Sequence, residues 1–563
     1  MQPSPAIVAQ DAVRRLPRWA LWLCCLAYVL AGFLGRQAWR NPDISALGVM
    51  SELASGDASW LSPTLAQIQP EVDALLPYWI GAVGIALKPD WISPDMAARL
   101  PFMVLLLVTL AATWYASYHL ARSPMAQPVS FAFGGEAHPI DYARAIADGS
   151  VLACIACLGL AQLGHETTPA LVQLCATATL LYAMASLRQR GFMAIVIASL
   201  SMLALTLSGA PTLALLLGGG AGVLQLLAST SDAEPSERPW LAFWLILAII
   251  GVNVALAQGL DLWRWRIADT PDEWDDWRRL GQLWVWFTWP AGPLVMWALW
   301  KWRRQWISRH IAGLHILLPL WFVLVCSLSA ILTSASDRSL LLTLPAMASL
   351  AAFALPTLRR SVAALIDWFT LIFFTGSALI IWVVWLSMQT GLPAQPARNV
   401  ARLAPGFVHE FSWGLFVLAV FATVSWLVLI RWRIGRHRTA LWKSLALPAG
   451  GAVTCWVLLM TLWLPLLDYA RSYQPMATRV IELIGPADKC VAMQGLKQSQ
   501  IAALQLIGHY RLQPLQAQST CPWLIVAAPG LAVSMQGQSD NWTLRGTAGH
   551  PASKNEQLFI YRR

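Results

Sequence analysis

The sequence predicts an all-α polytopic membrane protein with a small α/β or α+β domain at its C-terminal end. Hydrophobic residues make up 57% of the 563 residues and charged residues only 12%, whereas soluble domains carry roughly 25% charged residues. Apolar runs of about 17–25 residues recur along the chain, and each can cross about 30 Å of hydrocarbon. Helices are expected for these runs because a helix satisfies its own backbone hydrogen bonds in lipid.

About thirteen apolar runs qualify as transmembrane helices. The first run lacks a clear small-x-small cleavage site, so we interpret it as a retained span and not as a signal peptide. The run 75–87 is short for a span, and we expect an interfacial or re-entrant helix there. The predicted spans are 19–35, 96–120, 146–163, 168–187, 191–208, 211–229, 240–257, 281–300, 311–333, 339–356, 362–387, 411–431 and 442–466.

Basic residues between the spans predict the orientation of the chain. If the N-terminus is cytoplasmic, every strong basic cluster faces the cytoplasm, as the positive-inside rule requires. This bias explains the net charge of +10 without a nucleic-acid partner. The expected location is a bacterial inner membrane. We expect a membrane domain at 1–466 and a C-terminal domain at 467–563. The first loop of the membrane domain, 36–95, and the C-terminal domain should both lie in the periplasm. The basic clusters lie at 188–190, 301–304, 359–360 and 431–438.

The tail after the last span has the pattern of a small folded domain. Short apolar stretches at 489–493, 523–528 and 557–561 predict strands, and the stretches 477–484 and 498–507 predict helices. Two cysteines, Cys490 and Cys521, lie in this polar tail and are a candidate disulfide pair in an oxidising compartment. The other seven cysteines lie inside apolar runs, where packing is the simplest interpretation.

Carboxylates of the first loop are the leading functional candidates, because ionisable groups near membrane depth are costly. Asp43 follows the first span directly, and the helix-compatible stretch 44–54 contains Glu52. Glu71 and Asp73 precede the apolar run 75–87 and could contact a substrate or a metal. The alternative interpretation is a solvated loop rich in helix caps and turns.

Further candidates lie at the predicted outer ends of later spans. Arg99 lies at the start of the second span and is one of these candidates. The alternative is an interfacial arginine whose guanidinium extends into water. Arg338 stands in an outside turn, where its guanidinium fork suits a phosphate; the alternative is a surface pair with Asp337. His165, beside Glu166, could contact a substrate or a metal, or it could be a turn residue. No P-loop, H-E-x-x-H or Rossmann glycine pattern is present.

Several segments resemble the GT-C membrane glycosyltransferases, specifically the aminoarabinose transferase (ArnT) and protein O-mannosyltransferase group. An acidic opening and helix follow the first span, and two further matches are the stretches before and within the second span. The others are an aromatic-Pro span and a basic turn before a span with a mid-helix proline. These segments read PDISALGVMSELASGDASW, PEVDALLPYWIGAVGIAL, AARLPFMVLLLVTLAATWYASYHLAR, LWVWFTWPAGPLVMWALW and LTSASDRSLLLTLPAMASLAAFAL.

The resemblance implies transfer of a sugar from a polyprenyl-phosphate donor to a hydroxyl of a lipid, glycan or protein acceptor. Asp43 falls on the family's catalytic acid, and Arg99 and Arg338 fall on basic positions that suit the donor phosphate. Either Glu71 or Asp73 falls on a further family acid. The cofactor stays open, a divalent metal being one option.

Three departures from the family pattern leave alternatives open. Ile44 replaces the second acid of the first loop, Val72 or Ala74 stands where a lysine is usual, and Thr168 stands where a later acid is usual. Changed specificity or lost activity would both fit, and a non-catalytic membrane scaffold is therefore one alternative. A transporter or flippase for a lipid-linked sugar is another, but it predicts charges deep within the spans, where this sequence has few.

Overall fold

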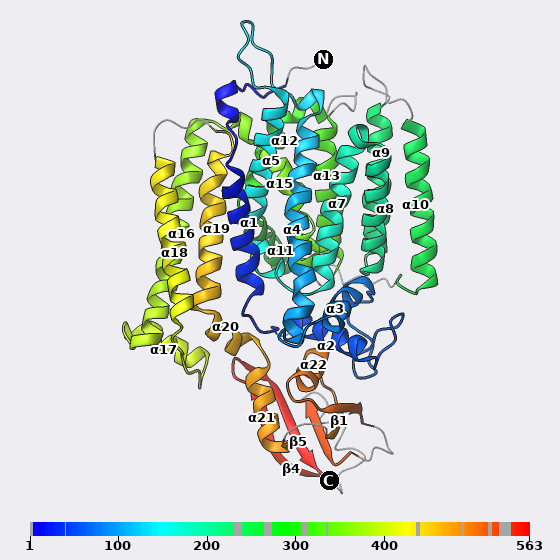
Figure 1. Ribbon diagram of the computed structural model, residues 1–563, viewed down its shortest axis with the longest axis vertical. Helices are drawn as coiled ribbons and strands as arrows, with labels where there is room; N and C mark the ends of the chain where they lie inside the picture. The colour runs from blue at the N-terminus through cyan, green and yellow to red at the C-terminus, as the bar shows by residue number, and fades with distance from the viewer. Residues whose placement is uncertain are drawn as a thin grey trace. The chain divides into compact units, whose positions relative to one another are not determined.

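The computed structural model has a mostly helical chain with a small C-terminal sheet (Figure 1). Part of the predicted basic cluster 431–438 and the last residue of the predicted strand 523–528 lie outside the described residues. The structure describes residues 4–39, 41–229, 239–263, 273–306, 313–333, 336–434, 440–485, 489–515, 521–527 and 542–563.

Two compact units make up the chain. The first unit comprises Met1–Phe33, Phe102–Ala378 and Ala419–Leu458, and the second comprises Leu34–Pro101, Leu379–Leu418 and Leu459–Arg563. The predicted boundary between a membrane domain and a C-terminal domain at residue 466 stays a prediction.

Helices form the first unit, and several of them lie side by side, as α8, α9 and α10 do in Figure 1. The division between the units falls within four further helices: α4 (Pro94–Ala121), α16 (Arg360–Thr390), α18 (Trp413–Ile434) and α19 (Lys443–Leu462). The helices inside the first unit are α1 (Arg18–Phe33), α5 (Pro139–Ala156), α6 (Leu158–Leu163), α7 (Pro169–Arg190), α8 (Phe192–Leu207), α9 (Pro211–Ser229), α10 (Pro239–Gly259), α11 (Trp274–Thr288), α12 (Ala291–Trp306), α13 (Leu314–Leu332), α14 (Ser336–Leu341) and α15 (Leu344–Ala352), with the 3₁₀ turns η1 (Gln10–Val13), η2 (Pro124–Ala126) and η3 (Leu355–Thr357).

The core of the first unit lies around α15, whose residues are all buried. This helix packs against α5, α12 and α13. Small residues allow the close approach: a Cβ added at Gly149 would lie 2.5 Å from Leu355. Ser117 donates a hydrogen bond of 2.9 Å to Ser349 inside this core.

Nine helices of the described residues are long and apolar enough to cross a membrane. The shorter apolar helices α1 and α8 coincide with two more of the predicted spans. The prediction of a polytopic helical membrane fold with a small C-terminal α/β domain is confirmed.

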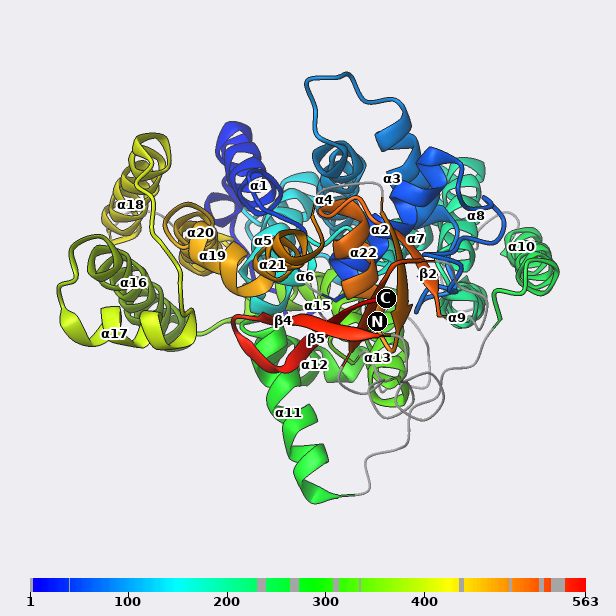
Figure 2. The ribbon, with the colours of Figure 1, turned by 90° about the horizontal axis from the view of Figure 1, so that it is seen from below.

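The predicted span 146–163 is divided between α5 and α6 at Cys157, so this part of the prediction is wrong. The predicted span 281–300 is not one helix either. It is divided between α11 and α12, which meet at Trp289 and Pro290. Proline lacks a backbone N–H and disfavours a helical conformation in the residue before it, so the first helix ends there. Figure 2 shows α11, with Asp275 and Asp276 in its first turn, extending away from α12 and α13.

Two helices follow α1 in the second unit, where the sequence predicts helices at 44–54 and 75–87. These are α2 (Pro42–Ser55) and α3 (Leu76–Ala86), which pack against each other. Proline at the first position of α2 and a left-handed Gly56 after its last residue fix its two ends. The remaining helices of this unit are α17 (Ala394–Leu403), α20 (Leu464–Arg471), α21 (Gln474–Ile484) and α22 (Gln498–Leu506).

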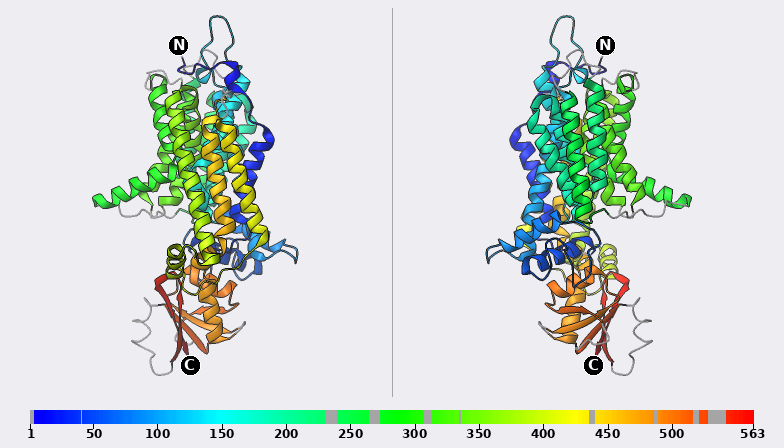
Figure 3. Two further views of the ribbon diagram at one scale, coloured as in Figure 1. Left: turned by 90° about the vertical axis from the view of Figure 1, so that its left-hand side faces the viewer. Right: turned by 90° about the vertical axis from the view of Figure 1, so that its right-hand side faces the viewer.

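A five-stranded sheet with the order β2-β1-β3-β5-β4 closes the chain (Figure 3). The strand β1 pairs in parallel with β2 and β3, whereas β5 is antiparallel to β3 and β4. Three of the strands and both helices coincide with predicted elements; β2 and β4 carry no clear apolar alternation and were not predicted. The strands are β1 (Cys490–Gln494), β2 (Arg511–Pro514), β3 (Trp523–Ala527), β4 (Thr543–His550) and β5 (Ser553–Arg562).

Helix α22 connects this domain to α2 within the second unit. A Cβ added at Gly48 of α2 would lie 2.7 Å from the Cβ of Ala502, so the two helices touch closely. Glu52 of α2 accepts hydrogen bonds of 2.7 Å from the Ala66 amide and 2.8 Å from the Gln505 side chain. Burial raises the pKa of the Glu52 carboxyl above its usual value.

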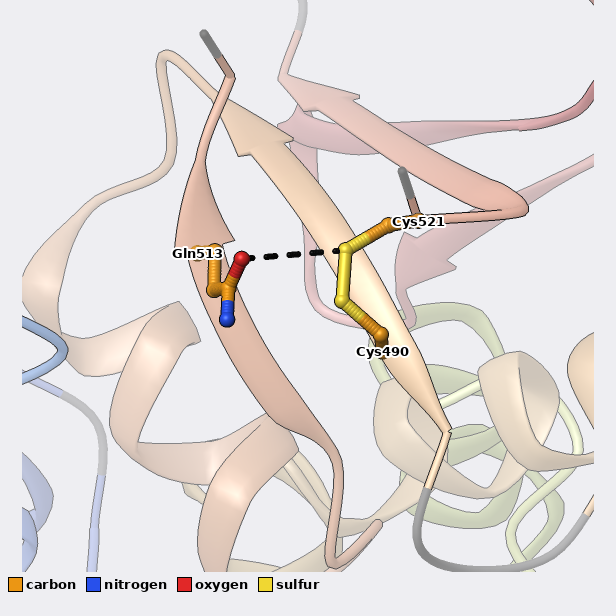
Figure 4. The surroundings of a disulfide bond; sticks show 3 residues. All are labelled: Cys490, Gln513 and Cys521. Carbon is orange, nitrogen blue, oxygen red and sulfur yellow. Dashed lines mark hydrogen bonds between the residues drawn. A yellow bond between two sulfur atoms is a disulfide. The ribbon is translucent and has the colours of Figure 1, made fainter. Parts of the chain in front are cut away.

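A disulfide joins Cys490, at the start of β1, to Cys521, just before β3 (Figure 4). The two Cα atoms are 5.1 Å apart, and the bond closes a loop with a sequence separation of 31. Cys521 packs in a buried cluster with Ala492, Leu524 and Val526. The bond therefore links two neighbouring parallel strands at one edge of the domain core.

Replacing both Cys490 and Cys521 by serine is expected to destabilise the C-terminal domain by about 3 kcal/mol, because the reduced chain regains loop entropy on unfolding. Limited proteolysis of the full chain at increasing urea concentrations, with cleavage within residues 490–563 as the signal, measures the loss of stability. Reductant should produce the same shift in the wild type and none in the double variant. Equal urea midpoints for the two proteins would contradict this expectation.

The raised pKa of Glu52 predicts a pH-dependent stability. A raised carboxyl pKa contributes stability that is present at low pH and is lost as the pH rises through the folded-state value. Glu52→Gln keeps an oxygen acceptor but cannot ionise. The melting temperature of this variant minus that of the wild type should therefore increase as the pH rises from 4 to 7. The exposed Glu482→Gln is the control, and a difference that stays constant with pH would contradict the prediction.

Candidate active site

Asp43 lies in the first turn of α2 and is buried with a basic partner. The Arg36 guanidinium is 2.9 Å from its carboxylate, and each of the two side chains is only 1% exposed. The Trp39 amide donates a second hydrogen bond of 3.2 Å to the same oxygen of Asp43. A buried charge needs such partners, because an unpaired carboxylate away from water is strongly unfavourable.

Arg99, at the start of α4, joins the same network. Its guanidinium donates a hydrogen bond to the backbone carbonyl of Arg36. It also forms an ion pair of 2.9 Å with Asp95, one turn earlier on α4. The structure therefore brings together two predicted site residues, Asp43 and Arg99, with Arg36 between them.

Residues beyond the last predicted span complete this network. Asp468, on α20, accepts a 2.8 Å hydrogen bond from the indole N–H of Trp39 and another from the Gln37 amide at 3.2 Å. Burial raises the pKa of Asp468, and these hydrogen bonds oppose the rise. Arg471, one turn further, lies over the Trp39 ring at 5.2 Å from its centroid.

Sequence reasoning missed Arg36, Trp39 and Asp468 as site residues. Asp468 is 429 residues from its partner Trp39, and nothing in a single sequence pairs positions so far apart. The one available indication was an acid and a base three positions apart, Asp468 and Arg471, directly after a predicted span.

Arg338 belongs to the first unit, where it pairs with an acid of a different turn. Its guanidinium is 3.0 Å from the Glu166 carboxylate and 3.6 Å from Asp337. The side chain is 25% exposed, whereas Glu166 is 6% exposed. Glu166 stands two positions before Thr168, so an acid is present close to the position where the family acid was expected.

His165 is a fully buried packing residue of the first unit. Its two ring nitrogens face the backbone oxygens of Tyr28, at 3.0 Å, and Ala161. Rings of Tyr28, Phe33 and Trp456 surround it, and a Cβ at Gly32 would overlap its imidazole. In this arrangement neither nitrogen is directed at a metal or a substrate.

Glu71 and Asp73 lie in the second unit without a shared ligand geometry. The Glu71 side chain is exposed, and its backbone amide donates to Gln498 at 3.0 Å. Asp73 is half-buried. Within the described ranges, no group of three or more His, Cys, Asp or Glu side chains could hold a metal ion. The predicted metal contacts Glu71, Asp73 and His165 are therefore not joined by other side chains into a metal-binding group within the described residues.

Comparison with known proteins identifies the fold. No protein-family model and no curated protein matches the sequence. The crystal structure of ArnT from Cupriavidus metallidurans in the apo state aligns over 97% of both chains, with a TM-score of 0.59 and 13% identity. ArnT from the same organism bound to undecaprenyl phosphate aligns over the same shares, with a TM-score of 0.60 and 13% identity.

An oligosaccharyltransferase of Archaeoglobus fulgidus, tethered to an acceptor peptide, aligns over 88% of this chain and 64% of its own. Its TM-score of 0.43 and identity of 8% are too low to carry weight. The two ArnT structures show that this chain has the ArnT fold, which confirms, at the level of the fold, the resemblance predicted from the sequence.

The buried pair predicts a large and asymmetric effect of mutation. Arg36→Met leaves Asp43 charged and without its cation, which should cost about 3–5 kcal/mol of stability. Adding Asp43→Asn removes the stranded charge, so the double variant should recover part of the loss. Arg479→Met, in an exposed pair with Glu482, is the control at about 0–1 kcal/mol. Unfolding of the purified protein in detergent measures all three, and equal losses for the single and double variants would contradict the prediction.

Proposed function

We propose that this chain with the ArnT fold is a membrane glycosyltransferase that moves a sugar from a polyprenyl-phosphate carrier to a hydroxyl acceptor. One observation carries the proposal: the alignment over 97% of both chains with an ArnT structure bound to undecaprenyl phosphate. A polyprenyl-phosphate donor is already activated and needs no nucleotide pocket, which agrees with the missing nucleotide motifs in the sequence.

In the proposed reaction the acceptor hydroxyl oxygen attacks the anomeric carbon of the sugar. The bond between that carbon and the phosphate oxygen breaks, and its electron pair leaves with the polyprenyl phosphate. The hydroxyl proton must pass to a base, and the departing phosphate must be stabilised by positive charge. Both requirements concern side chains at the ends of the membrane spans.

Asp43 is the proposed base. Its carboxylate is held by Arg36 at 2.9 Å and by the Trp39 amide at 3.2 Å, so its orientation is fixed before a substrate binds. A fixed carboxylate loses less freedom when it accepts the proton than a mobile one would. Its burial also keeps bulk water away from the carboxylate.

Arg338 and Arg99 are the proposed phosphate-binding groups, and Arg338 is the more exposed of the two. Its guanidinium is partly exposed, and a fork of parallel N–H donors suits phosphate oxygens. When the phosphate binds, Glu166 would either stay paired with this guanidinium or lose the ion pair to the phosphate. Arg99 is buried and already engaged by Asp95 and the Arg36 carbonyl, so its main contribution is to hold the first loop.

The proposed setting is the inner membrane of a bacterium, with the N-terminus in the cytoplasm and the first loop and C-terminal domain in the periplasm. Positive residues between the spans support this orientation. The donor then lies in the outer leaflet, and its acceptor is a lipid, glycan or protein on the same side. A divalent metal is not assigned, because the residues that the structure describes contain no ligand set for one.

Asp43→Asn is expected to lower transfer by at least about 100-fold, because general-base catalysis typically contributes 10²–10⁴-fold. Mass spectrometry of glycolipids from cells with and without the gene identifies the product, and membranes from the variant are then assayed with a polyprenyl-linked donor. The exposed Asp90→Asn, in the same loop, is the matched control and should keep full activity.

Two outcomes would count against the proposal. Full transfer by folded Asp43→Asn would remove Asp43 as the base. If deleting the gene leaves the glycolipid profile unchanged in cells that normally express the protein, sugar transfer to a lipid is excluded. If the profiles of glycans and glycoproteins are also unchanged, the scaffold alternative is favoured.

A further inference from the structure

We infer that Asp468 is a positioning residue for Asp43, acting through Trp39 from the far end of the chain. Trp39 lies between the two acids and binds both, Asp43 through its backbone N–H and Asp468 through its indole N–H. The effect on sugar transfer rests on the proposed function, whereas the effect on the first loop can be measured without a substrate.

Asp468 fixes the short segment 36–39 at two points. One carboxylate oxygen accepts the Trp39 indole N–H at 2.8 Å, and the two oxygens accept the Gln37 amide at 3.2 and 3.4 Å. Hydrogen bonds to an ionised acceptor are about twice as strong as neutral ones, and burial of Trp39 and Asp468 removes competition from water.

Trp39 in turn holds the start of α2 from three directions. Its backbone N–H donates to Asp43, and its backbone carbonyl accepts the Ile44 amide at 3.2 Å. Its ring carries the Arg36 guanidinium at 4.6 Å, the same guanidinium that forms the ion pair with Asp43. Displacement of Trp39 would therefore disturb both the amide and the guanidinium that bind the Asp43 carboxylate.

Asp468 can act as a fixed point because α20 is tied to the C-terminal sheet. The Ser472 carbonyl, at the end of α20, accepts from His550 of β4 at 3.0 Å. The next residue, Tyr473, donates its hydroxyl to Glu556 of β5 at 3.4 Å and lies 3.1 Å from the Ser499 hydroxyl of α22. All these contacts belong to the second unit and are buried.

The structural test uses amide hydrogen exchange at Ile44 and Ser45 in the full-length protein in lipid nanodiscs. Asp468→Asn removes the negative charge of the acceptor at nearly constant shape, and Trp39→Phe removes the indole N–H together with part of the ring. Each substitution should speed exchange about tenfold or more. If the two residues act through one contact, the double variant should be no faster than the faster single variant. Glu482→Gln, an exposed carboxyl of α21, should leave exchange unchanged.

The catalytic test compares kcat and KM for a polyprenyl-phosphate sugar. A positioning role predicts a kcat lowered about tenfold with an unchanged donor KM, because the base is misplaced while donor contacts remain. Asp468→Glu, which can restore a charged acceptor, should recover more activity than Asp468→Asn. A general loss of folding would instead lower the amount of active enzyme and be visible as a lower melting temperature.

Unchanged exchange at Ile44 in both Asp468→Asn and Trp39→Phe would overturn the inference, as would fully additive effects in the double variant. If Asp468→Asn fails to fold, Trp39→Phe decides the result, because a phenyl ring has no N–H to donate to Asp468 but keeps an aromatic face for Arg36. Faster exchange in a protein whose wild type transfers no sugar would support the structural tie and reject the proposed function.

Discussion

The buried ion pair between Arg36 and Asp43 is the constraint around which the first loop is organised. Two opposite charges with about 1% exposure each are tolerated only if every strong donor and acceptor finds a partner. Trp39 supplies an amide, Arg99 binds the carbonyl of Arg36, and Asp468 fixes the Trp39 indole. The result is a connected network within the second unit that links the segment 36–39, the start of α2, the start of α4 and α20.

Local patterns in the sequence were enough to predict most elements of the fold. Apolar runs revealed the spanning helices, the helix-compatible stretch 44–54 revealed α2, and short apolar stretches revealed three of the strands. The span at 281–300 failed because hydropathy averages over Pro290, while the backbone responds to that single residue. Strands β2 and β4 escaped because their residues alternate weakly and their place depends on neighbours in the sheet.

The candidate site was predictable as a set of residue types but not as a set of contacts. Asp43 and Arg99 stood out because charges near a membrane are costly, and the structure places them in one network. Their partners come from positions that carry no recognisable motif, such as Trp39 and Asp468. His165 shows the converse: a histidine near a predicted outer turn looked functional, but three aromatic rings and two carbonyls account for its burial.

The distance along the chain between Trp39 and Asp468 has a consequence for biosynthesis. The partner of Trp39 is made 429 residues later, which at about 5–20 residues per second is a delay of roughly 20–90 s. During that interval the membrane helices are inserted while the first loop still lacks its last anchor. The network can therefore be completed only after Asp468 has been synthesised, so a ribosome that stops before this residue releases a chain whose Trp39 indole has no Asp468 to bind.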